Sequence, residues 1–166
     1  MKTRNKTLFL AQAAVIAAAY TVLCIAFAPI SYGEIQVRIA EALVILPFFT
    51  PAAVPGLFVG CLLSNILGGS VLLDVIGGSI ATLIGAIGSY YLRKNKILIL
   101  IPPILANVLI VPFVLRYGYG TNLPIPFMML TVGIGEIIAV GVLGSVLLRA
   151  LEKSGTMIFK KNQGAY

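Results

Sequence analysis

The sequence predicts an all-α integral membrane protein with six transmembrane helices and both termini in the cytoplasm. Of its 166 residues, 60% are hydrophobic and only 10% are charged, and the mean hydropathy is +1.06. Soluble domains carry roughly a quarter charged residues, so this chain could not cover the surface of a soluble fold. Its net charge of +7 comes mostly from chain ends and from connections between apolar runs. That pattern favours membrane topology over binding to nucleic acid.

The first helix is expected at residues 8–30. This charge-free run is longer than the roughly 20 residues that cross a hydrocarbon core about 30 Å thick. The basic residues Lys2, Arg4 and Lys6 in front of it, and Ala26-Phe27-Ala28 near its end, also resemble a signal peptide and its cleavage site. The apolar stretch is longer than the hydrophobic region of a signal peptide, which favours a retained helix.

The charge-free interval 42–73 allows either one long helix or two short ones. Pro51, Pro55 and Gly56 lie close together within it, and such a group favours a turn. Two short helices are therefore expected, at residues 35–49 and 53–67, and neither is long enough to cross the hydrocarbon core unaided.

The distribution of Lys and Arg also selects two helices over one in this interval. With six helices, ten basic residues lie on the side of the termini, and only Arg38 and Arg116 lie on the other side. With five helices the count becomes four inside and eight outside, which contradicts the excess of Lys and Arg in cytoplasmic loops. The ten inner residues are Lys2, Arg4, Lys6, Arg93, Lys94, Lys96, Arg149, Lys153, Lys160 and Lys161.

The last three helices are expected at residues 73–92, 97–115 and 125–150. Paired prolines fall at the start of the last two, where the missing N–H costs no helical hydrogen bond. The connections are short and the sequence contains no internal repeat, so a single membrane domain is expected over residues 1–166. The polar, basic segment from Lys153 onward is expected to be a cytoplasmic tail.

Small residues recur at a spacing of four in several of these helices, which places them on one face. Small faces allow close helix packing in lipid. For the first helix, packing inside the bundle and docking of a partner both stay open from the pattern alone. Internal packing is expected for the others. The residues are Ala13, Ala14, Ala17 and Ala18 in the first helix, Gly77, Ala81, Gly85 and Ser89 in the fourth, and Gly141 and Ser145 in the sixth.

Polar residues at membrane depth are the candidates for function. An ionised carboxylate at the bilayer centre costs about 2.5–3.5 kcal/mol, so such residues usually face a cavity or a partner. Glu136 and Asn107 fall near the midpoints of their helices and are expected at one depth. The outer half of the protein holds four acids and two bases, a sum of −2. This predicts a pocket that opens outward and suits a small cationic or donor-rich ligand.

The candidate substrate-binding residues are polar side chains of this outer half and its loops. If residues 34–41 are helical, their spacing places Glu34, Arg38 and Glu41 on one face. Two alternatives stay open: this face could be an ion-pair surface, and Asp74 could only cap its helix. The full set is Tyr32, Glu34, Gln36, Arg38, Glu41, Asn65, Asp74, Asn107 and Glu136.

Several classes of protein are excluded by what the sequence lacks. It contains no His, so a metal site, catalytic triad or proton relay that needs His is excluded. It has no P-loop for ATP hydrolysis and no inverted halves with matching broken helices. Cys24 and Cys61 are expected as small buried hydrophobes. The chain is therefore expected to bind a ligand, without a cofactor, and to need a partner to move it. An enzyme and a channel are the competing hypotheses.

Four blocks of the sequence place charged, proline and glycine residues in a distinctive order. They are GEIQVRIAEAL at 33–43, LPFFTPAA at 46–53, GLFVGC at 56–61 and LDVIGGSIATL at 73–83. Together they resemble the QueT family, the substrate-binding S components of energy-coupling factor (ECF) transporters. The resemblance covers roughly residues 5–150.

This resemblance implies a multi-pass protein of a prokaryotic cell membrane that binds a queuosine precursor of the aminomethyl-deazaguanine type. It implies an ECF transmembrane T component and two ABC-type ATPases as partners. The four alanines of the first helix would dock the T component, and the loop Ser31–Glu41 would cover the ligand. A different vitamin or nucleobase-like ligand is the alternative.

The resemblance also suggests a role for individual residues. A carboxylate accepts hydrogen bonds from a ring N–H and an exocyclic amine together, as acids do with base donors. We therefore expect Glu136 or Glu41 to read the guanine-like edge, with support from Asn107. Glu34 or Asp74 would then face the ammonium group of the ligand, and Tyr32 or another aromatic residue would stack on its ring.

Overall fold

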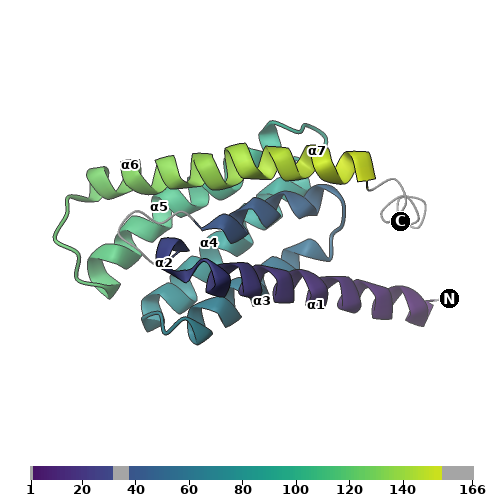
Figure 1. Cartoon of the computed structure of the whole chain (residues 1–166), viewed down its shortest axis with the longest axis horizontal. Coiled ribbons are helices and arrows are strands. Elements are labelled where there is room, and N and C mark those ends of the chain that lie inside the picture. The colour runs from purple at the N-terminus through teal and green to yellow at the C-terminus, as the bar shows by residue number, and fades with distance from the viewer. Residues whose placement is uncertain (1, 32–37, 155–166) are drawn as a thin grey trace.

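The computed structural model describes residues 2–31 and 38–154, and within the first range it describes the side chains of residues 6–29. The described residues form an elongated bundle of helices (Figure 1). The start of α1 and the end of α7 lie at the same end of this bundle (Figure 1). A chain that crosses a membrane an even number of times likewise has both of its ends on the same side. That this end faces the cytoplasm stays a prediction.

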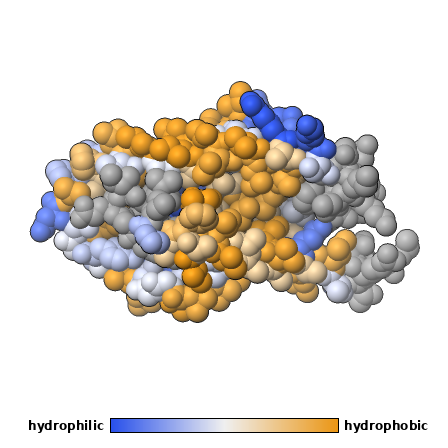
Figure 2. Space-filling model, in the orientation of Figure 1, coloured by the Kyte–Doolittle hydropathy of each residue, from blue (hydrophilic) through white to orange (hydrophobic). Residues whose placement is uncertain are grey.

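Four helical runs of the described residues are long and apolar enough to cross a membrane. Exposed apolar side chains cover them, such as Val15 at 68% and Leu130 at 61% exposure, and Figure 2 shows the resulting apolar surface. These runs are therefore those of a multi-pass membrane protein. They are α1 (Lys2–Ala26), α4 (Leu72–Tyr91), η2 with α5 (Leu98–Leu100 and Ile101–Gly118), and the continuous run of α6 (Ile125–Glu136), η3 (Ile137–Gly144) and α7 (Ser145–Ser154).

Two shorter apolar helices lie between α1 and α4. The first, η1 (Ile39–Phe48), is a 3₁₀ helix, and the second is the α-helix α3 (Ala53–Leu67). At the usual rise per residue they are about 20 Å and about 22 Å long, less than the roughly 30 Å hydrocarbon core. The turn expected around Pro51 separates them, and Thr50 Oγ1 accepts a hydrogen bond from the Ala52 N–H there. The prediction of two short helices is confirmed.

Each of the six expected segments is helical, but several boundaries differ. The first helix ends at Ala26 and is followed by the short α2 (Ala28–Ser31) instead of continuing to residue 30. Residues 35–37 of the second expected helix lie outside the described residues; η1 begins at Ile39, and Arg38 in front of it is extended, with φ −81° and ψ 98°. Arg38 and Glu41 therefore do not share a helical face.

The ends of the last two long helices also lie beyond the expected positions. The fifth helix continues to Gly118, so Arg116 belongs to its last turn and not to the following loop. Its guanidinium donates to the Thr121 carbonyl oxygen at 3.1 Å, which satisfies an acceptor just past the helix end. The sixth continues to Ser154 through η3, a π-helical segment.

Helices α1 and α3 approach closely because glycines of α3 face alanines of α1. A Cβ atom at Gly60 would lie 2.9 Å from the Ala17 carbonyl oxygen, and one at Gly56 would lie 2.7 Å from that of Ala13. Ala13 and Ala17 are thus used in packing within the chain, and docking of a partner on this helix stays a prediction. Ala14 and Ala18, on the neighbouring stripe, are exposed.

The face of small residues expected on α4 is confirmed as an internal packing surface. A Cβ atom at Gly85 would lie 2.7 Å from Pro103 Cα of α5, and Ser89 Oγ donates to the Ile99 carbonyl oxygen at 2.6 Å. The expectation that Gly141 and Ser145 form the packing face of the sixth helix is wrong in detail. A Cβ atom at Gly141 would meet only Ile137 Cγ2 of the same helical run, whereas one at Gly144 would lie 3.1 Å from Ile45 Cγ2 of η1.

Replacing Gly60 with alanine tests the α1–α3 contact. Gly60→Ala is expected to destabilise the protein by about 1–3 kcal/mol, because the new methyl group overpacks a tight contact. Gly133→Ala is the matched control, since its Cβ atom would meet only Val108 Cγ2 at an ordinary 3.4 Å. Thermal unfolding in detergent measures both. Equal stability of the two variants would contradict the close approach.

Candidate functional site

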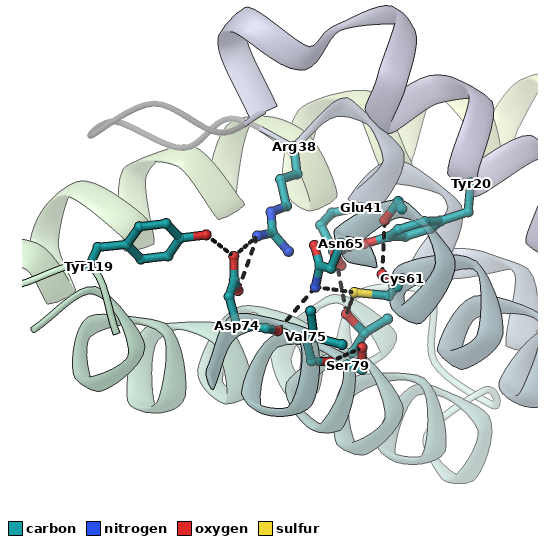
Figure 3. Close-up of polar contacts among 11 residues, drawn as sticks. Tyr20, Arg38, Glu41, Cys61, Asn65, Asp74, Val75, Ser79 and Tyr119 are labelled. Atoms are coloured by element: carbon teal, nitrogen blue, oxygen red, sulfur yellow. Dashed lines mark hydrogen bonds and ion pairs between the residues drawn. The ribbon is translucent and has the colours of Figure 1, made fainter. Parts of the chain in front are cut away.

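Polar side chains from α1, η1, α3 and α4 meet inside the bundle (Figure 3). Arg38 is 6% exposed, Glu41 and Asp74 are each 1% exposed, and Asn65 is fully buried. This burial excludes the alternative in which Arg38 and Glu41 form a surface ion-pair face. Buried polar groups require partners, so the contacts of these four side chains define the site.

Asp74 is the centre of the first group of contacts. Arg38 Nη2 lies 3.2 Å from Asp74 Oδ2 and 3.3 Å from Oδ1, and the two side chains form a buried ion pair. Tyr119 donates to Asp74 Oδ2 at 2.9 Å, and Asn65 Nδ2 donates to the Asp74 carbonyl oxygen at 3.1 Å. The N-cap of α4 is Val71, without a side-chain cap. Asp74 therefore binds neighbouring elements and does not merely cap its helix.

Two local features support this ion pair. Burial raises the pKa of the Tyr119 hydroxyl, which lies beyond the end of α5, and the Asp74 carboxylate raises it further. The phenol thus keeps its proton at neutral pH and can donate to Asp74. Gly78 provides the necessary space, since a Cβ atom there would lie 2.8 Å from Asp74 Oδ1 and 3.2 Å from Asn65 Nδ2.

Glu41 is the centre of the second group of contacts. The Tyr20 hydroxyl of α1 donates to Glu41 Oε1, and Thr82 Oγ1 of α4 donates to the same atom at 3.3 Å. Thr82 Oγ1 also lies 3.4 Å from Cys61 Sγ, which in turn lies 3.7 Å from Asn65 Nδ2. Through these contacts the Glu41 group and the Asp74 group form one continuous polar cluster.

Asn107 and Glu136 extend this cluster toward α5 and α6. They are 4% and 5% exposed. Asn107 lies beside the carboxyl groups of both Glu41 and Glu136, and these two carboxyl groups interact electrostatically. The expectation that Asn107 and Glu136 lie at one depth agrees with this placement.

Three acceptor atoms of the cluster are buried and have no hydrogen-bond partner among the described residues. They are Glu41 Oε2, Asn65 Oδ1 and Glu136 Oε2. Leaving such a group unpaired costs about 1–3 kcal/mol, more if it is charged. Neither carboxyl group forms an ion pair among the described residues, and the base that acts electrostatically on both, Arg38, is held by Asp74. The cluster is therefore suited to a ligand that carries several N–H donors or a positive charge.

The described residues contain no group of three or more His, Cys, Asp and Glu side chains placed to bind a metal ion. Cys24 and Cys61 are buried free thiols, as the sequence predicts.

The structure thus brings together six of the nine predicted site residues. The other three, Tyr32, Glu34 and Gln36, lie outside the described residues. Sequence reasoning missed Tyr20, Thr82 and Tyr119. Tyr20 follows Ala17 on the same face of the first helix. A hydroxyl group at the end of this alanine stripe is the sequence signal that could have identified Tyr20 as a site residue. The six residues are Arg38, Glu41, Asn65, Asp74, Asn107 and Glu136.

Comparison with known proteins identifies relatives of this chain. The family model of the QueT transporter matches residues 10–153. The queuosine precursor transporter QueT of Lactococcus lactis subsp. cremoris (strain MG1363) is 35% identical over 83 residues. That alignment covers 49% of this chain and 48% of the relative, so it spans about half the length of each. No solved structure is a significant match.

The buried ion pair predicts a large effect of a small substitution. Asp74→Asn leaves the Arg38 guanidinium buried without its counter-charge and is expected to destabilise the protein by about 3–5 kcal/mol. Glu152→Gln removes the carboxylate of the exposed Lys96–Glu152 pair and is the matched control, with an expected cost below about 1 kcal/mol. Thermal unfolding in a non-ionic detergent measures both. An Asp74→Asn variant as stable as Glu152→Gln would show that the buried pair is not formed.

Proposed function

The chain belongs to the QueT transporter family, and we propose that it is the substrate-binding subunit of a membrane importer of a queuosine precursor. One observation carries the proposal. Inside an apolar bundle, three acceptor atoms from η1, α3 and α6 are buried without partners among the described residues. A bound ligand with N–H donors would satisfy them. The family and the name of the Lactococcus relative support a queuosine precursor as that ligand.

The chemistry of an aminomethyl-deazaguanine matches the cluster. Its guanine-like edge presents a ring N–H and an exocyclic amine, which one carboxylate can accept together. Glu41 or Glu136 would accept the hydrogen bonds of this edge. Asn107, which lies beside both carboxyl groups, would support the accepting carboxylate. Asp74 already accepts from Arg38 and Tyr119. This favours Glu34 over Asp74 for the ligand ammonium, and Tyr32 would stack on the ring.

The proposed subunit is an ECF S component, which does not hydrolyse ATP itself. The sequence contains no P-loop, so two partner ABC ATPases would supply the energy. The transmembrane T component would dock on α1, where Ala14 and Ala18 are exposed and where small residues permit close helix approach. Ala13 and Ala17 would act indirectly, by holding α1 against α3.

The proposed orientation places the protein in a prokaryotic cell membrane with both termini inside. Ten basic residues, counted from the sequence, belong to the terminal side and two to the other, as expected if the terminal side is cytoplasmic. The Asp74 group would then lie near the outer face, where an S component receives its ligand. A different vitamin or a nucleobase-like compound is the alternative ligand.

Isothermal titration calorimetry with 7-aminomethyl-7-deazaguanine tests the assignment of the edge-reading carboxylate. A lost hydrogen bond to a charged group weakens binding by about 1.5–3 kcal/mol, or roughly 10- to 150-fold. We expect this loss for Glu41→Gln, for Glu136→Gln, or for both. Arg116→Gln is the control, because Arg116 is exposed and contacts only the Thr121 carbonyl oxygen among the bonds described above. Its affinity should equal that of the wild type.

Two outcomes of the same titration would count against the proposal. Unchanged affinity in both carboxylate variants would show that neither reads the guanine-like edge. A wild-type protein that does not bind the deazaguanine, but does bind riboflavin or thiamine, would assign the subunit to a different vitamin.

A further inference from the structure

A second polar site lies at the end of the bundle where α1 starts and α7 ends. The connection between α4 and α5 and the start of α7 enclose an open pocket of about 530 Å³. Figure 2 shows a hydrophilic patch over this connection, at the upper right, directly beside apolar surface. Asp74 lies in the first turn of α4, and the connection that lines the pocket follows the other end of this helix, whose 20 residues span about 30 Å. The pocket is therefore separate from the proposed substrate site.

The pocket carries an excess of positive charge. Lys94, Lys96 and Arg149 line it together with the single acid Glu152, which gives three positive charges against one negative. Lys96 Nζ lies 2.7 Å from Glu152 Oε1 and 2.9 Å from Oε2. Lys94 and Arg149 have no ion pair within residues 38–154. The lining thus offers two basic side chains to an anion.

Apolar side chains continue from the rim of the pocket along the helices. Ile97 is 73% exposed, Val146 is 61% exposed and Ile101 is 42% exposed. Tyr91, just before the connection, is 77% exposed, and tyrosines concentrate at the membrane–water interface. The basic side chains therefore lie where the apolar surface ends, at the depth of lipid headgroups.

We propose that this pocket binds the phosphate headgroup of an anionic phospholipid, with the acyl chains against Ile97, Ile101 and Val146. A lipid supplies both the negative charge and the apolar chains that this surface requires, whereas an acidic soluble protein would leave the apolar rim uncovered. Basic pockets between transmembrane helices on the cytoplasmic side bind anionic headgroups in other membrane proteins. The bound lipid would hold the connection against α7, alongside the Lys96–Glu152 ion pair.

Native mass spectrometry of the full chain in detergent tests this proposal. Dioleoyl phosphatidylglycerol and dioleoyl phosphatidylcholine are titrated in parallel, and tighter binding of phosphatidylglycerol is expected. Each basic residue near a membrane surface contributes about five-fold to the attraction of anionic lipid, so Lys94→Ala with Arg149→Ala should weaken phosphatidylglycerol binding on the order of 20-fold. Lys6→Ala with Lys153→Ala is the control pair, because both residues are exposed but do not line the pocket.

A third variant distinguishes charge from structural damage. Glu152→Gln removes the only acid of the lining and is expected to strengthen phosphatidylglycerol binding about five-fold. Unchanged or weaker binding in this variant would contradict the proposal. So would equal binding of the two lipids by the wild type, or an equal loss in the control pair.

Inorganic phosphate separates a lipid site from a site for the free anion. If phosphate displaces phosphatidylglycerol from the wild type at equal concentration, the pocket recognises the anion alone and the lipid proposal is wrong. Retention of phosphatidylglycerol in excess phosphate supports the contribution of the acyl chains.

Discussion

The buried ion pair between Arg38 and Asp74 is the interaction on which the site depends. An uncompensated charge inside an apolar bundle is strongly destabilising. The pair neutralises the charge of Arg38 and joins the chain just before η1 to the first turn of α4. Arg38 is the N-cap residue of η1, and Glu41 lies in the first turn of that helix. Because Asp74 holds Arg38, neither Glu41 nor Glu136 forms an ion pair among the described residues, and the pair thereby shapes the charge of the proposed ligand site.

Close packing of small residues brings the polar side chains within reach of one another. The glycines of α3 allow α1 to approach, and this approach places the Tyr20 hydroxyl on Glu41. Gly78 leaves room for Asp74 and Asn65 in the same way. One face of α1 thus contacts the proposed site, while the neighbouring stripe with Ala14 and Ala18 is exposed. Under the proposed function, a single helix connects ligand binding to the docking of the T component.

Much of this organisation is predictable from the sequence, because lipid penalises buried charge and unpaired backbone groups strongly. Apolar runs and the distribution of Lys and Arg predict six helical segments, and the cost of polar residues in lipid marks Asn107 and Glu136 as functional candidates at one depth. The extended Arg38 and the 3₁₀ helix were not predictable, since tertiary contacts decide them. Nor could spacing tell Ala13 and Ala17 from Ala14 and Ala18, because the choice depends on the glycines of α3.

Mass spectrometry of the small molecules that copurify with the protein tests the central claim most directly. The wild-type chain would be expressed in a host that makes queuosine precursors, purified in detergent and extracted with organic solvent. The account predicts a deazaguanine in the extract, at about one molecule per chain. Recovery of riboflavin, thiamine or another vitamin in its place would contradict the proposed ligand.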